Sequence, residues 1–152
     1  MGGWFALSAG SRQSPRDIEQ RRTDRSDQAA MLIAEASPAL ELAFLARVAE
    51  DRGKNELNQA VNAFTITASI QSMVITDPQV RERVRNHYLL SFELDELASR
   101  PRDLSLYVPA LRHPAAAMVD ALDAHVDNRP LPAYQAPPVN DRQRLVAWRP
   151  DL

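Results

Sequence analysis

The three histidines are the side chains best suited to metal binding or acid–base chemistry in this sequence, because it contains no cysteine. A metal site on a helix needs two ligands three or four positions apart, so that both point to one side. His87, His113 and His125 each lack a histidine or carboxylate at those distances. The sequence therefore predicts no metal site, and we expect His87, which falls on an apolar stripe, to be a buried and hydrogen-bonded core residue.

Two further groups of residues resemble parts of known sites but lack the surrounding structure that such sites require. Asp120, Asp123 and Asp127 share one helical face, but no glycine-containing turn accompanies them as in a calcium loop, so we interpret them as solvated. Ser8 lies in a degenerate form of the nucleophile-elbow motif, without the strand and helix that hold such a serine in place. We therefore predict that the protein is not an enzyme and has no catalytic residue and no cofactor. An enzyme whose site is assembled from distant segments is the alternative.

Composition excludes several other classes of function. The 4 glycines include none after Gly53, which rules out a glycine-rich phosphate loop in the last two thirds of the chain. A net charge of −2 is too small to create a general attraction to nucleic acid or to an anionic membrane. The N-terminus fits neither a signal peptide nor a membrane span, so we expect cytoplasmic residence. The preference for arginine over lysine and the many alanines suggest a bacterial, GC-rich source.

The elements that must position any site are predicted to be helices. With 152 residues, 45% of them apolar, the chain has material for one core. We expect an all-α fold: a compact bundle of about four helices over residues 27–127. Residues 1–26 are predicted to form a flexible or extended, charged N-terminal arm, whose charged run could also extend a helix into solvent. Residues 128–152 are predicted to form an extended, Pro-rich tail.

Capping residues and prolines divide the bundle into helices. Ser26 is expected to cap a helix over 27–36, and Ser37-Pro38 to start a second over about 38–52 that stops at Gly53. Asn55 is expected to cap the segment 57–76, and Asp77-Pro78 to start a helix that ends near Ala98. Residues 102–113 are predicted to form a connector, and Pro114 to open the last helix.

The segment 57–76 is unusual because its 20 residues include no charge. We favour a helix, although alternation of apolar and polar residues from Phe64 to Val74 makes a strand the competing interpretation. Neutral polar groups can be buried at modest cost when they are hydrogen-bonded. The segment is therefore either the central helix of the bundle or an interface with another subunit. Its candidate partner-binding residues are Asn58, Asn62, Thr65, Ser69 and Gln71.

Two other regions could bind partners. One helix flank interleaves arginines and aromatic rings, which could stack on bases or hold an acidic partner; it comprises Arg81, Arg85, Tyr88 and Phe92. Leu89 lies on the expected wet face of the same helix. The tail offers Leu131, Tyr134 and Trp148 as anchors, either for its own domain or for another chain.

The sequence therefore predicts a non-enzymatic protein–protein interaction protein. It would serve as an adaptor, accessory subunit or assembly component that self-associates or binds a protein partner. A small nucleic-acid-associated regulator that uses the arginine and aromatic flank is the alternative, and an enzyme comes third.

Overall fold

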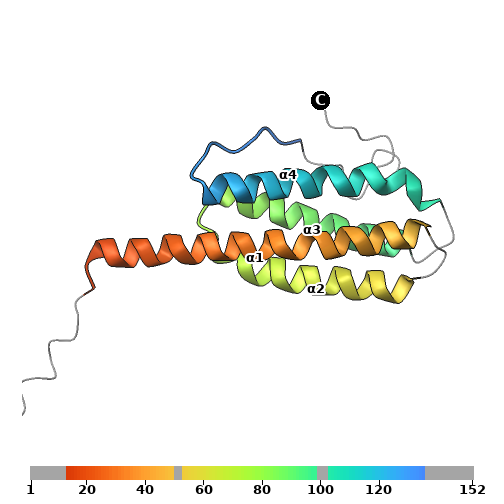
Figure 1. Cartoon of the computed structure of the whole chain (residues 1–152), viewed down its shortest axis with the longest axis horizontal. Coiled ribbons are helices and arrows are strands. Elements are labelled where there is room, and N and C mark those ends of the chain that lie inside the picture. Colours follow the sequence, from red (N-terminus) through yellow and green to blue (C-terminus); the bar gives the residue numbers. More distant parts are fainter. Residues whose placement is uncertain (1–12, 50–52, 99–102, 136–152) are drawn as a thin grey trace, which may run out of the picture.

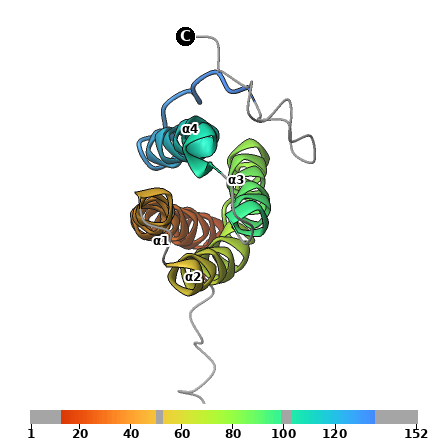
Figure 2. The same cartoon turned by 90° about the vertical axis from the view of Figure 1, so that its right-hand side faces the viewer.

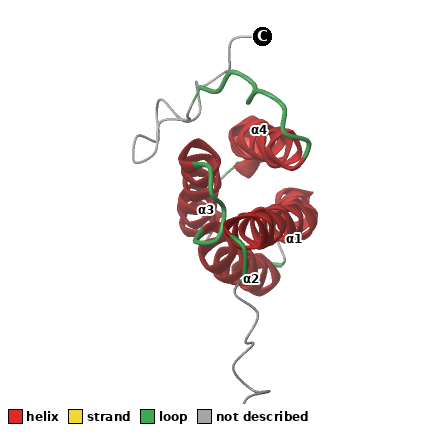
Figure 3. Cartoon of the chain, turned by 90° about the vertical axis from the view of Figure 1, so that its left-hand side faces the viewer, coloured by secondary structure: helices red, strands yellow, loops and turns green. Residues whose placement is uncertain are grey.

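A computed structural model describes residues 13–49, 53–98 and 103–135 as an antiparallel four-helix bundle (Figure 1). The helices are α1 (Pro15–Ala49), α2 (Lys54–Ser72), α3 (Pro78–Ala98) and α4 (Val108–Val126), with a short 3-10 helix, η1 (Leu104–Tyr107), before α4. Within those ranges every regular element is helical (Figure 3), which confirms the all-α prediction.

The helices form a ring in which each packs mainly against two neighbours, because α4 closes back on α1 (Figure 2). The apolar stripes of all four helices point into this ring and form one core. α2 contributes Leu57, Val61, Phe64 and Ala68, which is the inner stripe that helical spacing predicts. A helix in such a ring buries the side that faces its two neighbours and leaves its outer side to solvent.

α1 is one long helix, whereas the sequence predicted two. Ser14 and Asp17 form a reciprocal capping box: the Asp17 N–H donates to Ser14 Oγ and the Ser14 N–H donates to Asp17 Oδ2, each over 3.2 Å. The helix therefore begins at Pro15, and Ser26, expected to be a cap, is buried inside it. Pro38 also lies within α1. Its missing N–H removes one backbone bond, but buried Ile33 and Leu40 anchor the helix on either side.

The first turns of α1 extend beyond the bundle (Figure 1). The 35 residues of α1 span about 50 Å, against about 28 Å for the 19 residues of α2. Residues 15–25, which we call the overhang, are exposed and carry much of the predicted charged arm. Of the two expectations for that run, the structure has the helix extending into solvent; residues 1–12 lie outside the described part of the chain.

The segment 57–76 is helical over most of its length, since α2 ends at Ser72, so the strand interpretation is wrong. α2 starts at Lys54 directly after Gly53, so Asn55 lies within the helix and does not cap it. α3 confirms its predicted bounds: the carboxylate of Asp77 accepts from the N–H of Gln79 over 2.8 Å.

The connector predicted over 102–113 is wrong for most of its residues. The carboxylate of Asp103 caps η1 by accepting from the Ser105 N–H over 3.0 Å, and α4 already begins at Val108. Pro114, expected to open the last helix, lies inside it. Pro109 falls in the first turn, where its missing N–H is harmless, and Pro114 costs only one backbone bond.

Gly53 is the position at which the backbone requires glycine, because its φ of 86° lies in the left-handed region. A side chain there strains the backbone by about 1–2 kcal/mol, although a Cβ would meet nothing closer than 3.8 Å. We expect Gly53→Ala to lower the free energy of unfolding by about that amount in urea titrations followed by circular dichroism. Gly53→Asn is the matched control and should lose less, since asparagine tolerates this conformation. Equal stability of Gly53→Ala and the parent would contradict this assignment.

Candidate functional site

The outer side of α2 carries an apolar stripe that the bundle leaves uncovered. Ile66, Ile70 and Met73 are 60%, 56% and 80% exposed, and Ala63 is exposed one turn before them. The spacing of three, four and three residues is that of the a and d positions of a coiled coil. We call Ala63, Ile66, Ile70 and Met73 the α2 seam. The seam lies opposite the buried stripe, so α2 is apolar on two sides.

The polar residues predicted to bind a partner lie outside the seam, and some already bond within the chain. Asn62 Nδ2 donates to Asn58 Oδ1 over 3.2 Å, and Asn58 Nδ2 donates to Asp95 Oδ2 of α3 over 2.8 Å. Ser69 Oγ donates to the carbonyl of Ile66 over 3.2 Å. Thr65 and Gln71 are half-buried, and the Thr65 hydroxyl has no hydrogen-bond partner among the described residues. The uncharged segment therefore serves the bundle on one side and offers an apolar surface on the other.

The seam continues into a notch at the point where the overhang leaves the bundle. Val74, 40% exposed, borders a hollow of about 310 Å³ whose other lining residues come from the start of α1 and the residue before the cap. These are Gln13, Ile18, Arg21, Arg22 and Arg25. The overhang thus supplies three guanidinium groups and one exposed isoleucine next to the C-terminal end of α2.

The opposite end of α2 has the reverse charge. A hollow of about 470 Å³ there is lined by Lys54, Asn55, Asn58, Phe92, Asp95 and Glu96. Phe92 is 43% exposed and shares this hollow with two carboxylates and one ammonium group. That is not the charge that a phosphate ligand needs.

The remaining residues of the predicted α3 flank differ in how far their side chains are exposed to solvent. Arg81 and Arg85 are exposed, whereas Tyr88 is half-buried and packs against the core. Leu89 is exposed, as expected for its position on the wet face of α3. The structure therefore leaves two arginines and Phe92 open to solvent on this flank and uses the tyrosine ring for packing.

The described part of the tail folds back over the bundle (Figure 1). Leu131 packs against the core, and the Tyr134 ring lies under the Arg83 guanidinium, 5.0 Å from its centroid. Arg83 also donates to the carbonyl of Pro132, and burial raises the pKa of Tyr134. Leu131 and Tyr134 therefore anchor the tail to its own domain. Arg83 was missed in the sequence because its partners are about 50 residues away, and Trp148 lies outside the described residues.

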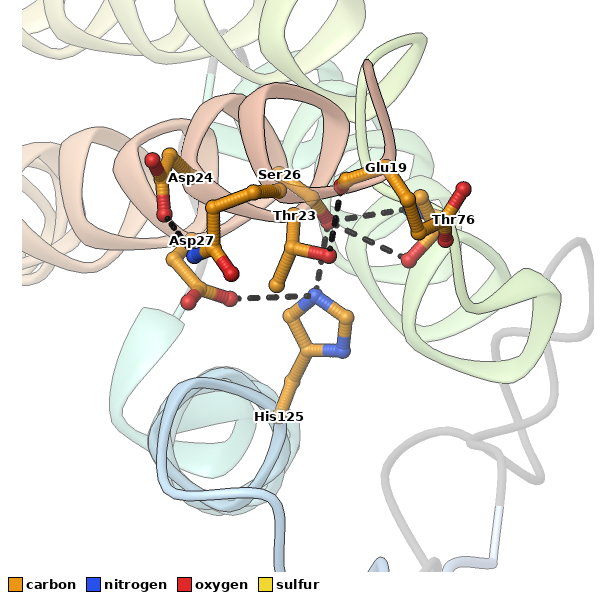
Figure 4. Close-up of polar contacts among 8 residues, drawn as sticks. Glu19, Thr23, Asp24, Ser26, Asp27, Thr76 and His125 are labelled. Carbon is orange, nitrogen blue, oxygen red and sulfur yellow. Dashed lines mark hydrogen bonds and ion pairs between the residues drawn. The ribbon is translucent and has the colours of Figure 1, made fainter. Parts of the chain in front are cut away.

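A polar cluster joins three segments at one end of the bundle (Figure 4). Ser26 Oγ of α1 lies 2.7 Å from His125 Nε2 of α4 and accepts from the Thr76 N–H over 3.0 Å. Asp27 Oδ1 approaches the same nitrogen, His125 Nε2, at 3.8 Å. In a catalytic triad the carboxylate would bind the other ring nitrogen. Ser26 is only 1% exposed, so a substrate could not reach it, and the cluster serves to hold the helices together.

His87 is buried as expected, but its predicted hydrogen bond is missing. The ring is 1% exposed and meets Phe64 edge to face, with 5.1 Å between centroids. Neither ring nitrogen has a hydrogen-bond partner within the described ranges. Burial lowers the pKa of His87 to about 4, so the imidazole is neutral near pH 7.

A further hollow of about 710 Å³ lies between α1 and α4, lined mainly by small and apolar side chains such as Ala34, Pro38 and Ala115. Glu41 and Arg112 border it and form an ion pair at 2.9 Å, so their charges neutralise each other. No group of three or more potential metal ligands occurs among residues 13–49, 53–98 and 103–135.

α1 meets the length and composition criteria for a membrane-spanning helix, with a mean hydropathy of 1.5 over its most apolar 18 residues. A third of that window is buried inside the bundle. This is weak evidence for a membrane span, because a helix that supplies a protein core passes the same test. The expected absence of a span and the cytoplasmic residence stay predictions.

Comparisons of the chain with protein-family models, with curated proteins and with solved structures found no match. The function must therefore be inferred from the surfaces and side chains of this molecule.

Ser26 provides a test of the polar cluster. We expect Ser26→Ala to lower the free energy of unfolding by about 1–3 kcal/mol, because the mutation removes the buried hydroxyl that accepts from the Thr76 N–H and bonds to His125 Nε2. Ser69→Ala, whose hydroxyl bonds only within its own helix, should change stability much less. Urea titrations measure both; equal losses in the two variants would show that the cluster contributes nothing specific.

His87 predicts a pH dependence of stability. The unfolded chain takes up a proton near pH 6.5 and the folded chain only near pH 4, so stability falls as the pH drops between these values. The loss is on the order of 3 kcal/mol at its full extent. His87→Leu should reduce the difference in unfolding free energy between about pH 7 and about pH 4.5. His113→Gln, at an exposed position, should retain it. Parallel pH profiles for His87→Leu and the parent would refute the buried neutral imidazole.

Proposed function

We propose that the chain is a non-enzymatic interaction protein, an adaptor, accessory subunit or assembly component, that binds a helix of another subunit along the α2 seam. The exposed apolar stripe of Ile66, Ile70 and Met73 carries this proposal. Scattered exposed leucines are ordinary on a protein surface, but three large side chains in coiled-coil spacing form a continuous docking stripe.

The absence of charge along the segment favours the same function. Covering an ionised side chain would require its desolvation, whereas no residue from Leu57 to Thr76 is ionised. Apolar area removed from water contributes about 25 cal/mol per Å², so the seam supplies the driving force and its neighbours add little opposition. The burial of Ser26 beside His125 supports the non-enzymatic part of the proposal, because this close serine–histidine pair is closed to substrates.

Two charge substitutions on the seam test the proposal. We expect the full-length chain, isolated from its source cells, to appear in native mass spectrometry at a mass above that of one 17.0 kDa chain. Ile66→Glu combined with Ile70→Glu should shift it to the single-chain mass, since two carboxylates would have to be buried in the interface.

Leu42→Glu is the matched control, because Leu42 is an equally apolar side chain, 67% exposed on α1 and outside the seam. It should retain the assembly. An assembly that survives in the seam variant, or a parent protein that is a single chain under all conditions, would exclude the proposed function. Circular dichroism of each variant confirms that the bundle is intact.

A further inference from the structure

We infer that the α2 seam binds a second copy of this chain, with the two α2 helices antiparallel about a two-fold axis between Ile66 and Ile70. This inference rests on the proposed function, because it names the partner for the same surface. Three features of the molecule support it: the match of side-chain sizes along the seam, the distribution of charge at the two ends of α2, and the position of the overhang.

The seam is complementary to itself in the antiparallel direction. Antiparallel coiled coils pair an a position of one helix with a d position of the other, so Ile70 meets Ile66 of the second copy, and Ala63 meets its Met73. The smallest residue of the seam thus faces the longest and most flexible one, which fills irregular gaps well. A parallel arrangement would instead pair alanine with alanine and methionine with methionine, giving layers of unequal width.

Charge at the ends of α2 also favours the antiparallel direction. The N-terminal end of α2 has the hollow with Asp95 and Glu96 on its α3 side, and exposed Glu56 lies in the first turn of α2, outside the lining of that hollow. The notch at the C-terminal end carries Arg21, Arg22 and Arg25, and the acidic side chains of the overhang do not line it. A two-fold axis across α2 keeps α1 of one copy on the same side as α1 of the other. Glu56 lies five helical turns before Val74 and so on the same side of α2 as the notch, which places Glu56 of each copy near the basic notch of the other. The hollow with Asp95 and Glu96 lies on the α3 side, away from that notch, whereas a parallel pair would put the two notches at the same end.

The dimensions agree with this arrangement. Glu56 precedes Ala63 by seven residues, so in the dimer it lies about 10 Å beyond Met73 of the second copy. The overhang lies at that level, because Ser26 bonds to Thr76 just after the end of α2. An interface of standard size buries about 800 Å² on each partner, more than the seam side chains expose. The overhang, with exposed Ile18 beside Val74, supplies further contact area.

Single cysteines test the inference, since the chain has none of its own. In the antiparallel dimer Ala63 faces Met73 of the second copy, while the two copies of position 63 are about 15 Å apart along the helix. A disulfide requires Cα atoms within about 7 Å. We therefore expect an oxidised mixture of Ala63→Cys and Met73→Cys chains to form disulfide-linked dimers, and neither variant to do so alone. A mixture of Ala63→Cys with Leu42→Cys is the control and should stay unlinked.

A second experiment measures the sedimentation velocity of the unmodified full-length chain at increasing concentration. We expect it to show a reversible dimer. Linkage of each cysteine variant with itself would establish a parallel pair and overturn the inference. A single chain at every concentration would also overturn the antiparallel dimer. The proposed function would survive that result if Ile66→Glu with Ile70→Glu still abolished a larger assembly of the protein isolated from its source cells. A dimer that persists unchanged in Ile66→Glu with Ile70→Glu would overturn both.

Discussion

A helix in a ring of four can bury only the side that faces its two neighbours, and α2 is apolar on a second side as well. The inner stripe, which includes Leu57 and Phe64, fills the core. The outer stripe, the α2 seam, has no helix of the bundle to cover it. The absence of charge from Leu57 to Thr76 has a different consequence on each side of α2. Toward α3, side-chain amides bond to one another and to Asp95. Toward solvent, no residue of this segment beside the isoleucines is charged. The fold and the proposed function both follow from this division.

Much of the fold could be predicted because the decisive signals are local. Asp77-Pro78 and Arg100-Pro101 identified the two ends of α3. Length and alanine content identified α2 as a helix, although its expected cap, Asn55, lies inside it. Pro38 and Pro114 misled the prediction for the opposite reason. A proline inside a helix costs about 3 kcal/mol locally, but its neighbours in α1 and α4 are buried against the core, and that packing outweighs the lost backbone bond. The start of α1 could have been predicted from the Ser14 and Asp17 spacing, which is a recognised capping pattern.

The side-chain contacts that link distant segments could not be predicted from spacing. Ser26 and His125 are 99 positions apart, and Arg83 meets the tail 49 positions later, so no periodicity relates them. The candidate surface was predicted in part. The uncharged segment was recognised, but its candidate residues were neutral polar ones, such as Thr65 and Ser69, whereas the exposed apolar surface is formed by the isoleucines that follow them, Ile66 and Ile70. α2 has two apolar stripes, and the positions of α1 and α3 decide which of them remains open.

The seam is small enough to be tolerated by a single chain in water and regular enough to be specific. The largest apolar patch on an ordinary monomer is about 300–600 Å², so a few exposed side chains of α2 do not by themselves force association. In the proposed dimer, specificity comes from the ends of α2, where Glu56 lies at one end and three arginines at the other, on the same side of the helix. Such exposed charges contribute little affinity, but they reject the parallel alignment. Apolar contact in the middle and opposite charges at the ends together favour one direction and one register, which is what a reversible, symmetric helix pair requires.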